Sequence, residues 1–264
     1  MKFLAVRRRS PIVATALLIG ALTVVGGGYA VIASVQPASA ALQVGAETQV
    51  EQGKKLYLEG CSSCHGLEAQ GTETGPTLIG VGAAAVDFQV STGRMPAAAP
   101  GAQVPARDKP LYTNDEIAAM AAYVATLGPG PAIPTAEQYD PANADAALGG
   151  ELFRINCSQC HQAAGEGGAL TQGKYAPNLM QSDPKTIYMA MLTGPQNMPV
   201  FSDAQLTTED KQHIIKYIGA LQTSSNPGGL SLGRIGPVTE GVFLVTAIFA
   251  ALLAAAIWIG IKAR

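Results

Sequence analysis

Apolar residues gather at the two ends of this 264-residue chain, in two runs that contain no charged residue. The first run extends from Pro11 to Val35 and the second from Gly241 to Ile261. About 20 consecutive apolar residues cross the hydrocarbon core of a bilayer as a helix, so both runs are long enough to span a membrane. The second run lies at the chain end and stops at Lys262, which favours a transmembrane helix over a buried core helix.

The N-terminal run allows two interpretations. Pro37 followed by Ala38-Ser39-Ala40 is typical of a signal-peptidase site, with cleavage before Ala41. The run is also longer than the apolar part of a usual signal peptide, as expected for a segment that stays in the membrane as an anchor. The sequence therefore predicts a signal peptide or a signal anchor over residues 1–40 and leaves the choice open.

Between the two ends, apolar residues recur at the spacing of amphipathic helices. Two stretches open with a capping box, Thr113-x-x-Glu116 and Thr207-x-x-Asp210, and continue with apolar residues along one helical face. Two more helices are predicted upstream of these. No stretch has sustained strand alternation, so the predicted fold class is all-α. The four helices are expected at about 48–59, 113–127, 146–155 and 207–221.

Four short segments of the first half of the chain return in the same order in the second half. Residues 52–66, 74–80, 91–96 and 113–127 correspond to residues 148–162, 175–181, 192–199 and 207–221. Two tandem copies of one module are therefore predicted. A module of about 80 residues is small for an apolar core to stabilise alone, which indicates a staple, a metal or a large cofactor. The predicted boundaries are 41–129 for module 1, 130–146 for a linker, 147–223 for module 2, 224–237 for a second linker and 238–264 for the C-terminal transmembrane helix.

The composition indicates a membrane protein with an exported middle. Hydrophobic residues make up 48% of the chain and charged residues 14%, which is more apolar than a soluble domain. Basic clusters at Arg7–Arg9 and at Lys262 and Arg264 flank the two runs. The positive-inside rule therefore places both ends in the cytoplasm and the modules on the extracytoplasmic side of the cell membrane. Residues 41–236 contain 18 acidic and 11 basic residues, a formal charge of −7, and nucleic acid is not an expected partner because phosphate neutralisation requires a basic face.

All four cysteines fall in two copies of Cys-x-x-Cys-His. This pentapeptide is the attachment signature of c-type haem. On one helical turn the two cysteines face the same side and can bond the two vinyl groups of one porphyrin, while the histidine lies under the iron. A disulfide framework does not need the histidines, a thioredoxin-like site needs a βαβ context, and structural zinc ligands are typically spaced further apart. Two covalently bound haem c groups are predicted, on Cys61, Cys64 and His65 and on Cys157, Cys160 and His161.

Each haem iron needs a sixth ligand, and the best candidates are two methionines. His213 is the one histidine outside the motifs, so it cannot serve both modules. Met95 and Met198 occupy matching places in the repeat, each before a proline and in a loop opened by Thr-Gly. The proline keeps the methionine backbone extended and out of a helix, and a methionine thioether raises the reduction potential. The predicted iron ligands are His65 with Met95 and His161 with Met198, whereas Met120, Met189 and Met191 lie in helical patterns and are assigned to the core.

Two smaller features follow from the repeat. Pro76 and Pro177 lie in the loops after the motif histidines, and their carbonyls are candidates to accept the second N–H of each imidazole. Gly53 and Gly149 each stand four residues before an aromatic residue on the first helix of a module. A small residue at this place predicts a close helix crossing.

With these residues placed, each module resembles a class I cytochrome c, and the whole chain resembles the dihaem cytochrome c subunit of the actinobacterial cytochrome bc complex, the menaquinol–cytochrome c reductase. The similarity covers nearly the full length. The segments that carry it are "STGRMPA", "GGALTQGKYAPNL", "MLTGPQNMPVFS" and the terminal apolar helix. The interval from His65 to Met95 is short for class I modules but agrees with that subunit.

The resemblance implies a role and partners. One haem would take electrons from the Rieske iron–sulfur protein, and the other would pass them to the copper centre of a haem-copper oxidase. The implied partners are cytochrome b, the Rieske subunit and the oxidase, associated in one assembly in the membrane. The chain would act as a redox subunit of a translocase, with no substrate site of its own.

Two alternatives remain at this level. The chain can be a tethered tandem dihaem cytochrome that serves another oxidase or a dehydrogenase. It can also be an enzyme, such as a dihaem peroxidase or a thiosulfate-oxidising cytochrome. An enzyme needs an open or exchangeable iron site, and one methionine candidate for each haem argues against it.

Overall fold

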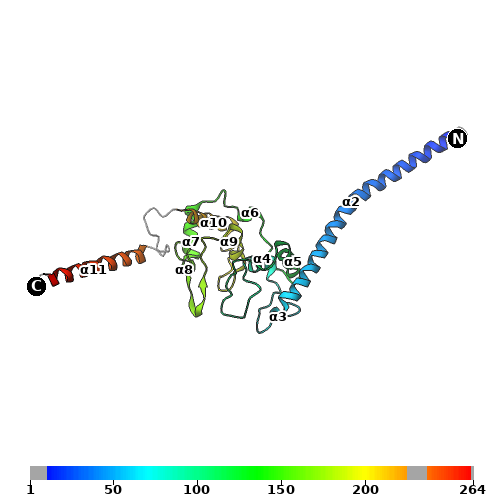
Figure 1. The fold of residues 1–264 in the computed structure, drawn as a ribbon. Coiled ribbons are helices and arrows are strands. Elements are labelled where there is room, and N and C mark those ends of the chain that lie inside the picture. The colour runs from blue at the N-terminus through cyan, green and yellow to red at the C-terminus, as the bar shows by residue number, and fades with distance from the viewer. Residues whose placement is uncertain (1–10, 225–236, 263–264) are drawn as a thin grey trace. The chain divides into compact units, whose positions relative to one another are not determined.

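The structure, a computed structural model, describes residues 11–224 and 237–262. The basic residues Arg7–Arg9 and Arg264 and nearly all of the second linker lie outside the described residues. Within the described part all regular secondary structure is helical apart from one pair of two-residue strands, and loops join the helices. The all-α prediction is therefore confirmed. The elements are α2 (Pro11–Gly60), α3 (Ser62–His65), α4 (Gly82–Ser91), α5 (Asn114–Ala125), α6 (Ala136–Tyr139), α7 (Ala146–Asn156), α8 (Ser158–His161), β1 (Gly168–Ala169), the 3-10 turn η1 (Thr171–Gly173), β2 (Tyr175–Ala176), α9 (Pro184–Thr193), α10 (Thr208–Thr223) and α11 (Pro237–Lys262) (Figure 1).

Two helices carry the apolar runs at the ends of the chain. Residues Ile12–Ala30 of α2 and Gly241–Lys262 of α11 are long and apolar enough to cross a membrane, and none of their residues is buried. The helix predicted from about Thr48 extends back without interruption to Pro11. The candidate cleavage point before Ala41 therefore lies inside a continuous helix. The choice between a signal peptide and an anchor stays a prediction.

The chain divides into a unit of residues 1–52 and a compact unit of residues 53–264, which holds both modules. In module 1 the end of α2 crosses α5 at Gly53. A Cβ atom on Gly53 would lie 1.9 Å from the carbonyl oxygen of Ala119, so only glycine permits this approach. One turn later, the rings of Tyr57 and Tyr123 pack with centroids 5.4 Å apart. The predicted close crossing is confirmed.

Module 2 repeats the crossing between α7 and α10. A Cβ atom on Gly149 would lie 1.9 Å from the carbonyl oxygen of His213, and the rings of Phe153 and Tyr217 lie 5.3 Å apart. The core beneath this crossing draws on α7, α9, α10 and the segment between the last two. Its buried members are Phe153, Ile187, Tyr188, Met191, Phe201, Leu206, Ile214, Ile215 and Ile218.

The capping boxes begin the last helix of each module as predicted. The backbone N–H of Thr113 donates to the Glu116 carboxylate at 2.8 Å, and the backbone N–H of Thr207 donates to Asp210 at 3.0 Å. The methionines assigned to the core are buried, with Met120, Met189 and Met191 each at most 2% exposed.

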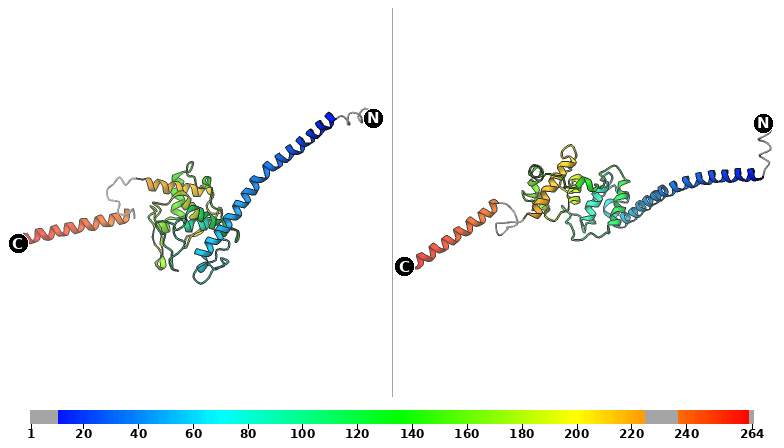
Figure 2. Two further views of the ribbon diagram at one scale, coloured as in Figure 1. Left: turned by 45° about the vertical axis from the view of Figure 1, so that its right-hand side comes forward. Right: turned by 90° about the horizontal axis from the view of Figure 1, so that it is seen from above.

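The predicted linker, residues 130–146, packs on both modules. Pro131 accepts a hydrogen bond from the backbone N–H of Ala84 at 3.1 Å. The linker also contains the short helix α6, where Gln212 of α10 donates to the carbonyl of Glu137 at 2.7 Å. Helix α4 of module 1 packs against α9 of module 2, so the two modules touch directly (Figures 1 and 2). There the ammonium of Lys185 and the carboxylate of Asp87 form an ion pair at 2.5 Å.

Candidate functional site

Each cysteine motif of module 1 and module 2 folds as one helical turn. In module 1 the backbone N–H groups of Cys64 and His65 both donate to the carbonyl of Cys61, at 3.1 and 3.0 Å. In module 2 the corresponding bonds run to Cys157, at 3.1 and 2.9 Å. Residues three and four apart on a helix lie on one face. The two cysteines and the histidine of each motif therefore share a face, as haem attachment requires.

The motif histidines are oriented by the prolyl carbonyls that the sequence singled out. Nδ1 of His65 lies 2.7 Å from the carbonyl oxygen of Pro76, and Nδ1 of His161 lies 3.0 Å from that of Pro177. A carbonyl only accepts hydrogen bonds, so Nδ1 carries the proton in both rings. This tautomer leaves the lone pair of Nε2 free to bind a metal.

Burial shifts the pKa values of three site residues, His161, Cys61 and Cys157. It lowers the pKa of His161, although the hydrogen bond to Pro177 opposes the shift, and so favours the neutral imidazole that ligates iron. Burial also raises the pKa of Cys61 to about 11 and that of Cys157 to about 12, in each case with a smaller contribution from the second cysteine. Reactive redox thiols have lowered pKa values, so the raised values of Cys61 and Cys157 do not fit the thioredoxin-like alternative. None of the four cysteines is in a disulfide bond.

A cavity of about 950 Å³ lies beside the motif of module 2 and is lined by residues of both modules. A cavity of this size lies near the upper end of the range for small-molecule and cofactor sites, about 300–1,000 Å³. Cys157, Cys160 and His161 line it, and so does Met198. The donor set and the volume therefore fit a haem held between His161 and Met198. The apolar part of the lining includes Phe153, Leu179, Met191, Ile214 and Ile218.

The loops with the two methionines both begin with a glycine of positive φ but are closed by different hydrogen bonds. Each leaves its helix through a glycine with positive φ, Gly93 at 69° and Gly194 at 58°, which is a conformation that other residues rarely adopt. The backbone N–H of Met95 donates to the carbonyl of Gln89 at 2.8 Å, and that of Met198 donates to Pro195 at 3.0 Å. Both methionine side chains are partly buried. Ligation of iron by Met95 and Met198 stays a prediction.

His213 has a structural role. It is partly buried, and its Nδ1 accepts a hydrogen bond from the backbone N–H of Asp145 at 2.8 Å. Asp145 in turn caps α7, accepting from the N–H of Ala147 at 2.7 Å. This contact links the first and last helices of module 2.

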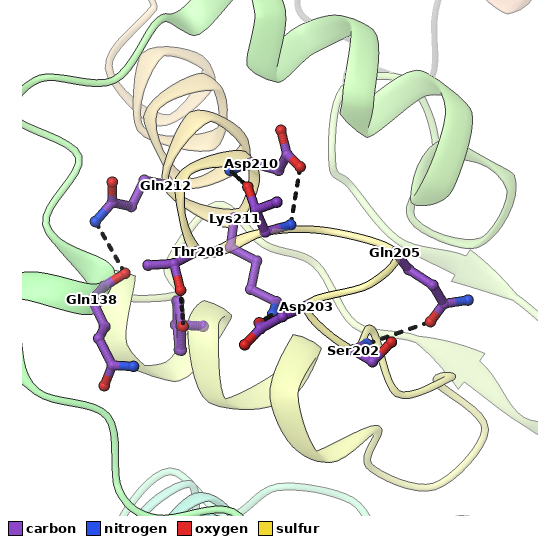
Figure 3. A network of polar contacts seen from close by, with 10 residues as sticks. Gln138, Ser202, Asp203, Gln205, Thr208, Asp210, Lys211 and Gln212 are labelled. Atoms are coloured by element: carbon purple, nitrogen blue, oxygen red, sulfur yellow. Dashed lines mark hydrogen bonds and ion pairs between the residues drawn. The ribbon is translucent and has the colours of Figure 1, made fainter.

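Two sets of side chains around the site were not singled out from the sequence. The first is the ion pair of Lys211 and Asp203 beside the segment that follows Met198 (Figure 3). The second is a group of amide contacts between the modules, made by Gln103 and Gln196. Lys211 lies on the apolar face of α10 with Ile214, Ile215 and Ile218. This spacing was a signal in the sequence that Lys211 is buried. The inter-module contacts have no local signal, because their partners lie 72 and 92 residues apart.

Comparison with known proteins places both modules. The family profile described as "Cytochrome c" matches residues 50–128, and the profile described as "Cytochrome C oxidase, cbb3-type, subunit III" matches residues 144–218. Each match overlaps one of the two predicted modules. The prediction of tandem cytochrome c modules is therefore confirmed.

Full-length relatives give a more specific match. Proteins named "Cytochrome bc1 complex cytochrome c subunit" are 46% identical in Corynebacterium efficiens, 44% identical in Mycobacterium leprae and 43% identical in Corynebacterium diphtheriae. The alignments cover 80%, 94% and 96% of this chain and 76%, 87% and 94% of those proteins. The similarity thus extends over both modules and into the terminal apolar segments.

Proposed function

Because this chain belongs to the family of cytochrome c subunits of the cytochrome bc1 complex, we propose that it carries electrons from the Rieske iron–sulfur protein of that complex to a haem-copper oxidase. Its cytochrome c domains imply covalently bound haem c. We assign one haem to each module. The residues that would hold them are Cys61, Cys64, His65 and Met95 in module 1 and Cys157, Cys160, His161 and Met198 in module 2.

Each of these residues has a defined task. The two thiols of a motif would hold the haem through thioether bonds, and the histidine would ligate iron through Nε2, with its ring oriented by the hydrogen bond from Nδ1 to the prolyl carbonyl. The methionine would supply a thioether ligand, which favours the reduced state of iron. Bound haem would supply an iron that alternates between the ferric and ferrous states. With a histidine and a methionine ligand for each iron, the chain would carry electrons rather than bind a substrate at iron.

The partners and the sidedness belong to the same proposal. Cytochrome b and the Rieske subunit would lie beside this chain in the membrane, and the oxidase would associate with them in a larger assembly. The apolar helices α2 and α11 support a membrane location. We propose that the modules face the extracytoplasmic side and that the C-terminus lies in the cytoplasm. The basic residue Lys262, at the end of α11, supports this orientation.

The observation that carries the proposal is the arrangement found in each module: a cysteine–histidine turn, a histidine held by a prolyl carbonyl, and a methionine in a loop that follows a glycine of positive φ. We expect the purified chain to retain two haems under denaturing conditions, as measured by a pyridine haemochrome assay. One haem for each chain, or haem that extracts into acidified solvent, would contradict the assignment.

Purification from native membranes tests the partners. We expect cytochrome b, the Rieske protein and oxidase subunits to co-purify with this chain, and quinol to reduce both haems. A tethered cytochrome serving another system would purify without cytochrome b and the Rieske protein. A peroxidase or thiosulfate-oxidising enzyme would show a haem that binds external ligands in the resting protein.

A further inference from the structure

The cavity of module 2 is not lined by module 2 alone. Residues of module 1 also lie on its wall, among them Phe88 of α4, Ile117 of α5, and Arg94, Gln103 and Arg107 around the loop between these helices. These side chains come from the module that holds its own cysteine motif. The surroundings of His161 and Met198 therefore depend on the position of module 1.

The lining loop of module 1 is an insertion relative to module 2. Between Met95 and the capping residue Thr113 the chain has 17 residues, whereas between Met198 and the equivalent Thr207 it has eight. We call residues 96–112 the insertion. Its base is fixed within module 1, because Arg107 donates from its backbone N–H to Gly93 at 3.1 Å and from Nη1 to Pro96 at 2.5 Å.

The tip of the insertion makes four hydrogen bonds to module 2, through two glutamines. Gln103 of the insertion accepts from the backbone N–H of Tyr175 at 2.6 Å and donates to the carbonyl of the same residue at 2.8 Å. Gln196 of module 2 accepts from the N–H of Val104 at 3.1 Å and donates to its carbonyl at 3.0 Å. Each side-chain amide thus binds both the backbone N–H and the backbone carbonyl of one residue in the other module.

These four bonds are made close to the segments that hold His161 and Met198, the proposed iron ligands of module 2. Tyr175 lies two residues before Pro177, whose carbonyl holds Nδ1 of His161. Gln196 lies two residues before Met198, in the same loop. The insertion therefore contacts the backbone that orients the histidine and the backbone that presents the methionine. The ion pair between Asp87 and Lys185 holds the modules together elsewhere, at the contact of α4 and α9.

We propose that Gln103 and Gln196 are positioning residues for the module 2 haem: through them the insertion of module 1 holds the Met198 loop and the Pro177 segment in place. The ligation of iron in module 2 then depends on module 1. The Met95 loop depends less on these bonds, because Arg107 ties the base of the insertion to Gly93 and Pro96 within module 1. This inference rests on the proposed function only in requiring haem between His161 and Met198.

The test uses the full-length chain with both haems and the variants Gln103→Ala and Gln196→Ala. Both side chains are at least partly exposed, so truncation leaves no buried void and the covalent haems remain attached. We expect the reduced module 2 haem of each variant to bind carbon monoxide at least about tenfold faster than wild type, because Met198 dissociates more readily. The module 1 haem should stay unreactive. Gln205→Ala is the matched control, since the Gln205 amide is exposed and contacts only Ser202 of its own segment, at 3.4 Å.

Combination with ligand variants identifies the affected haem. If Gln103 acts through Met198, its effect on carbon monoxide binding disappears in a Met198→Leu background, where that position is already open. The effect persists in a Met95→Leu background. This comparison is a double-mutant cycle, which isolates the coupling between two residues.

The outcomes separate the inference from the proposed function. Carbon monoxide binding as slow as in wild type in both glutamine variants would overturn the positioning role and leave the dihaem carrier intact. An equal effect of Gln103→Ala in the Met198→Leu background would overturn it too. A wild-type module 2 haem that binds carbon monoxide at once would instead contradict the assignment of Met198.

Discussion

The two modules share one scaffold but hold their methionine loops differently. In module 2 the segment after Met198 is short and is tied to its own last helix, where the ammonium of Lys211 lies 2.6 Å from the carboxylate of Asp203 (Figure 3). In module 1 the segment after Met95 is long and reaches the neighbouring module through Gln103. The two modules thus share a frame, which consists of the glycine helix crossing, the cysteine–histidine turn and the prolyl carbonyl. The segment after the methionine lies outside this frame and binds different partners in the two modules.

The difference is sharpest at one buried position. Ile117 and Lys211 both stand four residues after the capping threonine of their helix, and both are buried, at 3% and 0% exposed. The Lys211 ammonium also lies 5.6 Å from the ring centroid of Tyr188. Asp203 is 74% exposed, so Lys211 extends through the core and reaches its partner near the surface. Module 1 fills the same position with an apolar side chain.

Introducing the charge into module 1 should have the largest effect. Ile117→Lys would bury an ammonium without an equivalent of Asp203, and a buried unpaired charge costs about 3–5 kcal/mol. We expect the guanidinium midpoint of module 1, followed by the spectrum of its haem, to fall sharply, and that of module 2 to fall less, because Ile117 also lines the cavity beside His161. Ile117→Met is the control, expected to cost less than about 1.5 kcal/mol. An Ile117→Lys variant as stable as wild type would show that this position does not distinguish the modules.

Replacing the glycine of each helix crossing by alanine should destabilise the two modules equally. Gly53→Ala and Gly149→Ala each place a Cβ atom 1.9 Å from a backbone carbonyl oxygen, so the helices must move apart, at a cost of about 3 kcal/mol. Gly219→Ala, on α10, meets no atom within 4 Å and should stabilise module 2 by about 0.5–1 kcal/mol. The measurement is chemical unfolding of each variant. If one crossing tolerated alanine and the other did not, the shared frame would be wrong.

Two substitutions of Lys211 separate the contribution of its packing from the contribution of its charge to the stability of module 2. Lys211→Ala should destabilise module 2 by about 2 kcal/mol, because it leaves a cavity in the core. Lys211→Met keeps most of the volume and should cost less than about 1 kcal/mol, since Asp203 is exposed and stays hydrated. Unfolding curves of both variants give the comparison. Equal, large losses in the two would show that the ion pair itself stabilises the loop.

A tyrosine hydroxyl at each crossing donates a hydrogen bond, from the first helix in module 1 and from the last helix in module 2, and its loss should have the smallest effect. The Tyr57 hydroxyl on the first helix of module 1 donates to the carbonyl of Gly66 at 2.5 Å. In module 2 the first helix has Phe153 at that place, and Tyr217 on the last helix donates to Ala163 at 3.2 Å. Tyr57→Phe and Tyr217→Phe should each cost about 1 kcal/mol, measured by chemical unfolding. A loss of covalent haem in either variant would contradict a purely supporting role.

The frame of each module was predictable because its signals are local or repeated. The capping boxes at Thr113 and Thr207, the glycine crossings and the prolyl carbonyls at Pro76 and Pro177 all follow from spacing and from the alignment of the two halves. The continuous helix through Ala41 was not predicted, because the small residues around it are typical of a cleavage site. The ordering of α6 in the linker had a weak signal in the capping box of Thr135 and Gln138.

The part that could not be predicted is the contact between the modules. Gln103 lies in no periodic pattern or motif, and Gln196 lies in a segment that was singled out for Met198 alone. The partners of both are backbone groups of distant residues. Long-range contacts of this kind depend on how the finished modules pack. The insertion was visible as a length difference between the two halves, but its partner was not.

One measurement tests the central claim, that each module holds its own six-coordinate haem. It is a redox titration with a carbon monoxide difference spectrum on wild type, Met95→Leu and Met198→Leu. We expect both wild-type haems to be low-spin and slow to bind carbon monoxide. Each variant should keep two covalent haems, and the haem that has lost its methionine ligand should bind carbon monoxide. The reduction potential of that haem should fall because the thioether no longer favours ferrous iron. A wild-type haem that binds carbon monoxide at once, or a methionine variant with an unchanged spectrum and potential, would contradict the account.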